Sequence, residues 1–333
     1  MTCLASTRVL LDAVGRFPAL AAARDRLRRC TATGQRMGDL VPVVESDVAL
    51  AIAVLRLANH GPRRGTIGSV SDAVRVAGQA RLHALAQRVA VAEPLSHEPA
   101  DQARQHLRLH CLTVQATMDR LALANGQENR DELLTAALLH DLGKIAIGAE
   151  DDGASIADLG GYAAEPEARL QAERDRYGTD HAQLGGELAL RMGLPARLAQ
   201  AIAEHHTATG GCAGMVRLAD MLTLYAQGRV VDLSALVDLS AAVGLTREQL
   251  GQLMYELPQP VTTTRRTLQP CPLSAREVEV LKRLAAGEVY KQIGAALNLS
   301  PSTVRSHLHR IYTRIGVADR TQAVLLARES GWI

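Results

Sequence analysis

The fold centres on the stretch AALLHDLGKIAIG, residues 136–148, an apolar segment typical of a buried helix that carries a His-Asp pair. A charge buried without a partner is strongly unfavourable, so His140 and Asp141 must find partners or become neutral. Two interpretations follow from the residues alone. The pair either holds a metal ion or belongs to a hydrogen-bonded polar network within the core.

The composition around this stretch favours packed helices. Hydrophobic residues make up 47% of the 333 residues but aromatic residues only 2%, so Leu, Val, Ile and Ala must fill the interior. Such a core suits helices better than sheets rich in aromatic side chains. We therefore predict an all-α fold, and the length predicts two or three domains.

Helical periodicity is clearest in DVALAIAVLRLANHG, residues 47–61, where Gly61-Pro62 would end the helix. Further helices are expected between residues 102 and 228, over 232–242, and from Thr246, which forms a capping box with Gln249. The predicted inward face of the first of these helices comprises Ala51, Val54, Leu55 and Ala58.

The order of these segments predicts the domain organisation. PQPVTTTRRTLQPCP, residues 258–272, has four prolines and reads as a linker. We expect an N-terminal helical lobe (1–100), a second helical lobe with the His-Asp pair (101–228), connecting helices (229–257), this linker, and a C-terminal domain (273–333).

Targeting signals and disulfide patterns are missing from the sequence. No run of about 18 apolar residues and no signal peptide is found, which predicts a cytoplasmic protein. The cysteines are odd in number, scattered and free of CxxC pairs, so we expect reduced thiols. They are Cys3, Cys30, Cys111, Cys212 and Cys271.

Charge is concentrated at the C-terminal end. Residues 273–333 hold nine basic and five acidic residues, a charge of +4, so the rest of the chain carries −2 of the total of +2. A basic module on a slightly acidic body is typical of a protein that binds nucleic acid at one end.

The same C-terminal region has the pattern of a helix-turn-helix. Ser274 and Glu277 form a capping box, VYKQIGAALN (289–298) is a short second helix, and Ser300-Pro301 begins a third. A last helix is expected from Asp319, with Gln322 in its first turn. The predicted core positions are Val278, Leu281, Leu284, Ala285, Val289, Ile293, Ala296, Leu297, Val304, Leu308, Ile311, Ile315, Ala323, Val324, Leu326 and Ala327.

A polar stripe on the third helix would enter the DNA major groove. It comprises Ser302, Arg305, Ser306, His309 and Thr313. The alternative is a small helical bundle with a solvated face. Residues 273–327, LSAREVEVLKRLAAGEVYKQIGAALNLSPSTVRSHLHRIYTRIGVADRTQAVLLA, resemble the LuxR-type (GerE) helix-turn-helix. The resemblance implies double-stranded DNA as partner and a homodimer formed through the last helix. The implied DNA-binding set is Lys291, Ser302, Thr303, Val304, Arg305, Ser306, His309 and Arg310.

Polar residues elsewhere in the second lobe could converge on the His-Asp pair. The candidate ligands of one or two divalent ions are His110, His140, Asp141, His181, His205, His206 and Asp220. Imidazoles and carboxylates suit Fe, Mn, Zn or Mg. A bridging carboxylate between two ions would activate water for attack on a phosphodiester, and Lys144 would then be a catalytic residue that neutralises developing charge. Each histidine could instead be a satisfied core residue, and His206 only a helix cap.

The order of these residues resembles the HD superfamily of metal-dependent phosphohydrolases, and its HDOD branch in particular. The resemblance covers residues 8–226 and rests on LVPVVESDVALAIAVLRLANHGPRRGTIGSVSDAVRVAG (40–78), LLHDLGK (138–144), YGTDHAQLGGELALRMGLP (177–195) and AIAEHH (201–206). It implies a helical signalling module, and by superfamily analogy a nucleotide ligand. His206 is followed by TATGGCAG rather than the Gly-Tyr-Pro signature of cyclic di-GMP phosphodiesterases.

Three functions remain open at this point. The preferred hypothesis is a transcription regulator whose HDOD-like sensor, an HD-like helical bundle, controls a dimeric LuxR-type helix-turn-helix. The alternative is a metal-dependent HD-type phosphohydrolase or phosphodiesterase with an appended DNA-binding domain. The third is a protein-docking scaffold.

Overall fold

The computed structural model describes residues 6–60, 67–92, 98–149, 166–257, 272–285, 288–297 and 299–315, together with residues 317, 323, 327 and 332. Within these residues the chain is helical and contains no strand, which confirms the predicted all-α fold. A single bridge pairs Ala19 with Val91.

The helices divide between two compact units, Met1–Gln259 and Pro260–Ile333. In the first unit they are α1 (Thr7–Gly15), α2 (Ala21–Ala32), α3 (Met37–Glu45), α4 (Val48–Asn59), α5 (Val70–Arg88), α6 (Pro99–Ala124), α7 (Arg130–Leu139), α8 (Leu142–Gly148), α10 (Pro166–Tyr177), α11 (His181–Arg191), α12 (Ala196–Ala203), α13 (Gly211–Ala226), α14 (Leu233–Ala242) and α15 (Arg247–Glu256). In the second they are α16 (Ala275–Ala285), α17 (Tyr290–Leu297) and α18 (Pro301–Ile315).

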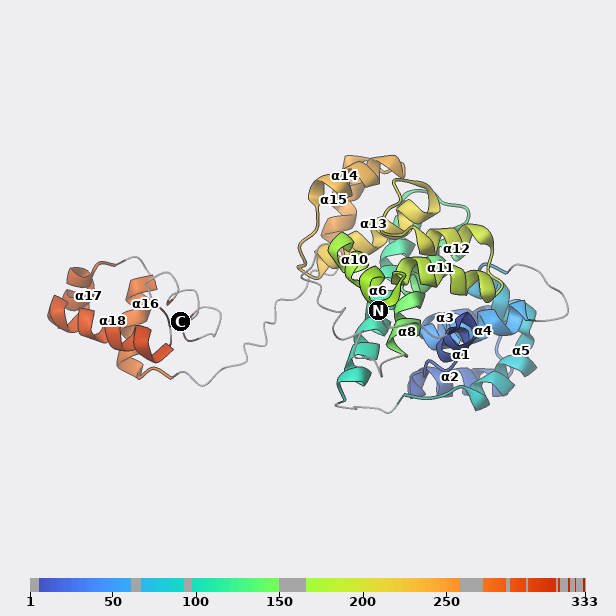
Figure 1. The fold of residues 1–333 in the computed structure, drawn as a ribbon, viewed down its shortest axis with the longest axis horizontal. Coiled ribbons are helices and arrows are strands. Elements are labelled where there is room, and N and C mark those ends of the chain that lie inside the picture. The colour runs from blue at the N-terminus through green and yellow to red at the C-terminus, as the bar shows by residue number, and fades with distance from the viewer. Residues whose placement is uncertain are drawn as a thin grey trace. The chain divides into compact units, whose positions relative to one another are not determined.

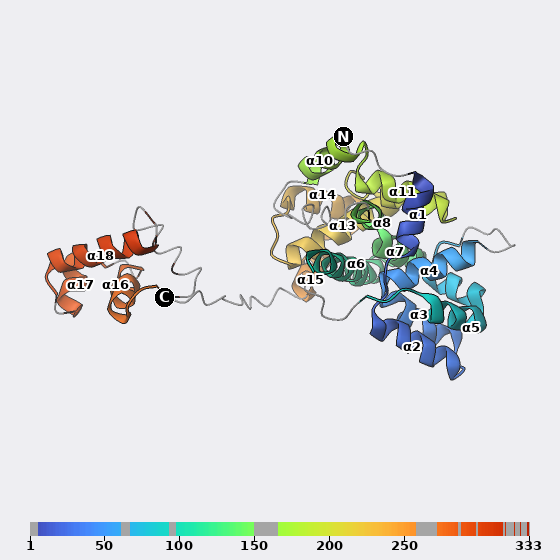
Figure 2. The same ribbon diagram turned by 60° about the horizontal axis from the view of Figure 1, so that its bottom comes forward.

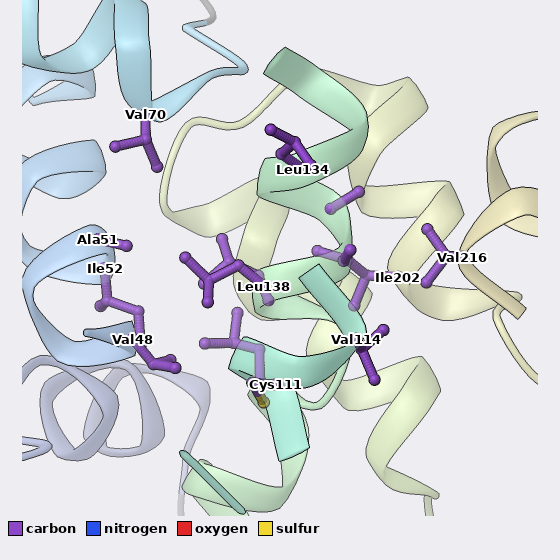
Figure 3. Packing of buried hydrophobic residues seen from close by; sticks show 14 of the residues in the cluster. Val48, Ala51, Ile52, Val70, Cys111, Val114, Leu134, Leu138, Ile202 and Val216 are labelled. Carbon is purple, nitrogen blue, oxygen red and sulfur yellow. The ribbon is translucent and has the colours of Figure 1, made fainter. Parts of the chain in front are cut away.

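In the first unit, α6, α7 and α8 lie at the centre, between α2–α5 on one side and α11–α13 on the other, and α1 packs against α4, α8 and α11 (Figures 1 and 2). One continuous hydrophobic core extends from Leu10 to Leu257. Figure 3 shows Val48 and Ile52 of α4 on one side of Leu138, with Ile202 and Val216 on the other. The N-terminal helices and the helices that carry the His-Asp pair therefore share one core.

Helix α4 forms where the sequence predicts a helix. The Asp47 side chain accepts a hydrogen bond from the backbone N–H of Leu50 and so caps the helix. The four predicted inward residues, Ala51, Val54, Leu55 and Ala58, are all buried. Gly61-Pro62 lies outside the described residues.

A buried ion pair fixes α6 against this N-terminal part. The Arg108 guanidinium Nε lies 3.5 Å from Asp47 Oδ2, and both side chains are almost fully buried. Arg108 also donates to the Pro18 carbonyl and lies over the Phe17 ring, 4.9 Å from its centroid. Because a buried charge tolerates little freedom in its partners, these contacts fix the position of the α6 turn that also carries His110.

The two helices predicted after residue 228 are present as α14 and α15, with the predicted capping box at Thr246. Asp232 accepts hydrogen bonds from Ser234 and Ala235 at the start of α14. Thr246 and Gln249 form the reciprocal capping box of α15.

The second unit has a small apolar core of its own. Its buried members among the predicted positions are Leu281, Leu284, Ile293, Leu297, Val304, Leu308, Ile311, Ala323 and Ala327, and Val278 and Ile315 are partly buried against them. The remainder of the predicted last helix, including Asp319, Gln322, Val324 and Leu326, lies outside the described residues, as does most of the predicted linker.

Two core predictions in this unit were wrong, and one core residue was missed. Val289 is 56% exposed and Ala296 is also exposed, whereas Val280, which was not predicted, is fully buried. Helix α17 begins only at Tyr290, so Val289 stands before its first turn rather than on its apolar face. The buried position on α17 next to Ile293 is Gly294.

Cys30, Cys111 and Cys212, the cysteines within the described residues, are free thiols, as predicted. Among those residues no helix combines the length and the hydropathy that a bilayer crossing requires.

Candidate functional site

The fold brings all seven predicted ligand residues together in the first unit. They come from five places along the chain: His110 on α6, His140 and Asp141 between α7 and α8, His181 at the start of α11, His205 and His206 after α12, and Asp220 on α13. His206 is partly buried and the other six are buried.

The first group of side chains lies on one side of Asp141. His110 Nε2 is 3.2 Å from His140 Nε2 and 3.2 Å from Asp220 Oδ1. Asp141 Oδ2 lies 3.4 Å from His140 Nε2 and 3.7 Å from His110 Nε2. Three of these residues, His110, His140 and Asp141, have ligand atoms close enough to share one ion.

The second group lies on the other side of the same carboxylate. His181 Nε2 is 3.0 Å from His206 Nε2. Asp141 Oδ1 lies 3.4 Å from His181 Nε2 and 3.9 Å from His205 Nε2. His181, His205 and His206 form a second cluster of metal-binding geometry. Asp141 thus directs one oxygen to each group, which is the arrangement of a bridging carboxylate.

Backbone carbonyl groups orient two of the imidazoles. Nδ1 of His140 lies 2.8 Å from the Ala137 carbonyl, and Nδ1 of His205 lies 2.7 Å from the Ile202 carbonyl. Because a carbonyl oxygen can only accept, each Nδ1 carries the proton and each Nε2 lone pair faces the cluster.

Glu173 orients the third imidazole, and the sequence analysis did not identify it. Its Oε2 lies 2.6 Å from Nδ1 of His181 and accepts the backbone N–H of the same residue at 2.7 Å. Carboxylate support of this kind is typical of metal-binding histidines. Glu173 lies on α10, eight residues before His181, and no local pattern connects the two positions.

The residues fit a divalent metal better than they fit an empty polar network. Asp141 Oδ1 and His205 Nε2 are buried without a hydrogen-bond partner. Two pairs of Nε2 atoms also face each other at 3.0 and 3.2 Å, and because Nδ1 of His140 and of His181 holds the ring proton, each pair presents at least one Nε2 lone pair to the cluster. A cation among these atoms would give such donors a partner, and the nitrogen and oxygen donors suit Mn, Fe or Zn.

Electrostatics favours the protonation states that metal binding requires. Burial lowers the pKa of His140 and holds the pKa values of His205 and His206 well below their usual range. Burial opposes ionisation of Asp141, but His140 and the Lys144 ammonium outweigh it and hold the pKa of Asp141 well below its usual range. At neutral pH, His140, His205 and His206 therefore present neutral imidazoles and Asp141 an ionised carboxylate.

Lys144 lies one turn beyond the pair, as its spacing predicts. Its Nζ donates to Asp141 Oδ2 at 2.8 Å, and the side chain is buried. The position places a fixed positive charge at the edge of the cluster.

Close packing of α8 and α11 makes this geometry possible. A methyl group at Gly143 would overlap the His181 carbonyl oxygen, and one at Gly185 would lie 3.1 Å from the backbone nitrogen of Gly143. Asp180 caps α11 by accepting from the N–H of Gln183 at 2.9 Å. These contacts fix His181 in the first turn of α11, against Asp141.

The predicted nucleic-acid face lies on α17 and α18 in the second unit. Ser300 caps α18 by accepting from the N–H of Thr303, as its position before Pro301 predicts. Thr303 is partly buried. The exposed members of the predicted set are Lys291, Ser302, Arg305, Ser306, His309 and Arg310, and Thr313 of the polar stripe is also exposed.

Val304 is fully buried in the core of the second unit, so it is not available to DNA and belongs to the packing of α18. Tyr290, which the sequence analysis did not assign to this face, is 37% exposed, and the Arg305 guanidinium lies 6.0 Å from its ring centroid. An aromatic ring under an arginine restricts where the guanidinium can point.

Family models match both units. The model of the HDOD domain matches residues 17–208, more than half of the chain, and the model of bacterial regulatory proteins of the luxR family matches residues 271–327.

Curated relatives match the C-terminal part. The "Putative HTH-type transcriptional regulator YhjB" of Escherichia coli (strain K12) is 54% identical over 54 residues, 16% of this chain and 27% of that protein. The "Transcriptional regulatory protein DegU" of Brevibacillus brevis is 41% identical over 61 residues, 18% of this chain and 26% of that protein. The chain thus spans about a quarter of the length of these relatives.

Solved structures resemble the first unit in fold. The MmoQ response regulator from Methylococcus capsulatus str. Bath superposes with a TM-score of 0.53 at 20% identity, over 72% of this chain and 97% of that one. A virulence factor from Campylobacter jejuni subsp. jejuni gives a TM-score of 0.51 at 18% identity, over 74% and 99% of the two chains. With these matches, the chain belongs to the HDOD family and carries a luxR-family helix-turn-helix domain at its C-terminal end.

Proposed function

We propose that this protein is a DNA-binding transcription regulator that acts in the cytoplasm as a homodimer, and that its HDOD unit receives the signal. The observation that carries the proposal is the pairing of a luxR-family domain with an HDOD unit in which two groups of His and Asp side chains converge. A signal that binds one arrangement of the dimer better than another would shift the population between them, and so change how two helix-turn-helix units meet two half-sites.

The α18 surface supports DNA binding. Arg305 and Arg310 extend from the exposed face of a helix that begins with a Ser-Pro cap, and Lys291 extends from the preceding helix. Cations on such a face neutralise DNA phosphates and release counterions, so affinity should fall steeply with salt. Polar side chains on the same face can contact base edges.

Binding of the full-length protein to genomic duplex fragments at several salt concentrations tests this proposal. We expect Arg305→Ala to weaken binding about tenfold or more and to reduce the salt dependence by about one ion. Arg247→Ala, an exposed arginine of the first unit, serves as the matched control and should bind as the wild type does. Failure of the wild type to bind any fragment in a salt-dependent manner would overturn the proposal.

We further propose that the seven His and Asp residues hold one or two divalent ions, in two groups bridged by Asp141. When bound, such ions would supply Lewis-acid polarisation and lower the pKa of a coordinated water. Glu173 would keep His181 oriented toward the cluster, and Lys144 would hold the second oxygen of Asp141.

This cluster also favours a second candidate function, metal-dependent hydrolysis of phosphoesters. The specific observation is the position of Asp141, which faces both histidine groups while a lysine donates to it. Metal analysis of protein purified under reducing, anaerobic conditions, followed by an assay with bis-p-nitrophenyl phosphate, tests both ideas.

We expect Asp141→Asn to lose the metal, while Asp175→Asn, an exposed carboxylate of α10, retains it. Turnover that Asp141→Asn abolishes would favour the enzyme. If the purified wild-type protein contains no metal, both the proposed metal site and the proposed hydrolase function are excluded.

A further inference from the structure

A cavity of about 290 Å³ opens beside the His/Asp cluster in the first unit. His206 and Asp220 of the cluster form part of its wall, and α10, α13 and the start of α14 form the rest. Its volume lies near the lower end of the range for small-molecule sites, about 300–1,000 Å³. A ligand here would touch the cluster directly and would be small.

The cationic side of this cavity is formed by three arginines, Arg169, Arg217 and Arg229. Arg169 gives the strongest indication of a ligand, because the residue is only 8% exposed and its Nε has no hydrogen-bond partner. No described carboxylate lies within ion-pair distance of its guanidinium. A buried guanidinium with an unsatisfied N–H is costly, so its retention points to an anionic ligand.

The acidic residues of the same wall are already engaged elsewhere. Glu167 pairs with Arg174 at 2.5 Å, Asp232 caps α14, and Asp220 faces His110. None of them neutralises Arg169. The cavity therefore combines fixed positive charge with carboxylates turned to other partners, and this favours an anion over a cation.

The rest of the lining is largely apolar. It is formed by side chains of α10, α13 and the segment before α14, namely Leu170, Met221, Leu224, Val231 and Ala235. A free inorganic anion would leave this surface unused. A ligand with one charged end and one flat or apolar end would use both walls.

We propose that this cavity binds a small organic phosphate of mononucleotide size, with its phosphate between Arg169 and the His/Asp cluster and its organic part against Met221, Leu224 and Val231. The planar guanidinium donates in the fork that matches phosphate oxygens. Such a ligand would be the signal of the proposed regulator, and in this respect the inference rests on the proposed function. Binding itself depends on Arg169 and the apolar wall, so it should be measurable in metal-free protein.

Calorimetric titration of the full chain with adenosine 5′-monophosphate, adenosine and inorganic phosphate tests the proposal, with and without chelator. We expect the nucleotide to bind at least tenfold more tightly than either adenosine or phosphate alone. Arg169→Gln should weaken nucleotide binding at least tenfold, and Arg169→Lys should recover part of it because the charge is kept. Arg191→Gln, an exposed arginine of α11, is the matched control and should bind as the wild type does.

A variant of the apolar wall separates the two halves of the site. Val231→Glu should weaken nucleotide binding more than phosphate binding. Because this variant keeps Arg169, it also tests the site if Arg169→Gln does not fold. Equal binding of adenosine and the nucleotide, equal binding of phosphate and the nucleotide, or unchanged binding by Arg169→Gln would each overturn the proposal. Absence of metal binding or DNA binding in the wild type would instead overturn the proposed function. The titration with chelator would still measure nucleotide binding in the cavity.

Discussion

The two units of this molecule place their functional side chains in opposite ways. In the HDOD unit, the candidate ligands are buried and come from helices far apart in the chain. In the helix-turn-helix unit, the candidate contacts are exposed and most of them lie on a single helix, above a core made of apolar side chains. A buried site needs the whole core to hold its geometry, whereas a surface site needs little more than one correctly seated helix.

Each unit has a position at which a small substitution should disrupt its site. Both units depend on a glycine at a close approach of two segments, Gly143 in the first and Gly294 in the second. Substitutions at these positions should break one unit while leaving the other folded, because the units have separate cores.

The largest effect is expected from Gly143→Ala. The added methyl group would overlap the His181 carbonyl oxygen, a backbone atom that cannot move without shifting α11. We expect a loss of about 3 kcal/mol or more in the free energy of unfolding of the HDOD unit, together with loss of metal. Hydrogen exchange resolved by domain would measure it.

Gly251→Ala is the matched control for this prediction. Gly251 lies on α15 with nothing within 4 Å of an added Cβ, so the change should stabilise the helix by about 0.5–1 kcal/mol. Faster exchange in α16–α18 caused by Gly143→Ala would contradict the separation of the two units, and wild-type stability of that variant would contradict the predicted overlap at Gly143.

The second effect is expected from Gly294→Ala. A Cβ here would lie 2.6 Å from the Leu299 carbonyl oxygen, in the turn that joins α17 to α18. We expect the helix-turn-helix to lose about 2 kcal/mol of stability and DNA binding to weaken, while metal content stays at the wild-type level. Fluorescence anisotropy with a labelled duplex and elemental analysis would test the two parts, and a loss of metal would count against it.

A smaller effect concerns pH and the packing of the HDOD unit. Burial, with a further contribution from the Asp131 charge, raises the pKa of Glu45 from 4.5 to about 7. The folded state then binds more protons than the unfolded state between these values, so stability contributed by this group falls as pH rises from about 4.5 to 7.

Glu45→Gln removes this titration. We expect the variant to gain about 1 kcal/mol over the wild type at pH 8 and little or nothing at pH 4.5. Urea unfolding at the two pH values measures the difference. An equal gain at both would show that the carboxyl group does not titrate in this window.

The smallest effect is expected at the DNA face. Tyr290→Leu keeps an apolar side chain but removes the ring under Arg305. A cation–π contact at an exposed site contributes about 0.5–1 kcal/mol, so DNA affinity should fall about two- to fivefold with no change in the stability of the unit. Wild-type affinity would mean that Arg305 needs no such support.

The structure also shows how far sequence reasoning extends. Helix α4, the caps at Asp232, Thr246 and Ser300, and the face of α18 follow from local patterns, because capping and amphipathic periodicity involve residues within a few positions of each other. The prediction for Val289 was wrong because periodicity was extended past the actual start of α17, and that for Ala296 was wrong because the buried face of α17 consists of Ile293, Gly294 and Leu297.

Residues far apart in the chain were harder to assign. Glu173, Arg169 and the Asp47–Arg108 pair were not identified, because their roles arise only where separate helices meet. Tyr290 was not assigned to the DNA face, because its contact with Arg305 crosses from α17 to α18.

The sequence by itself determined the residue types: which segments form helices, which helix presents a polar stripe, and which seven His and Asp residues needed partners. Only the tertiary structure decided that Asp141 faces two histidine groups at once, that Glu173 orients His181, and that a buried Arg169 with an unsatisfied Nε lines a cavity beside them. The physical reason is that local hydrogen bonding and periodicity are encoded within a few residues, whereas the geometry of a buried polar site is set by how distant helices pack.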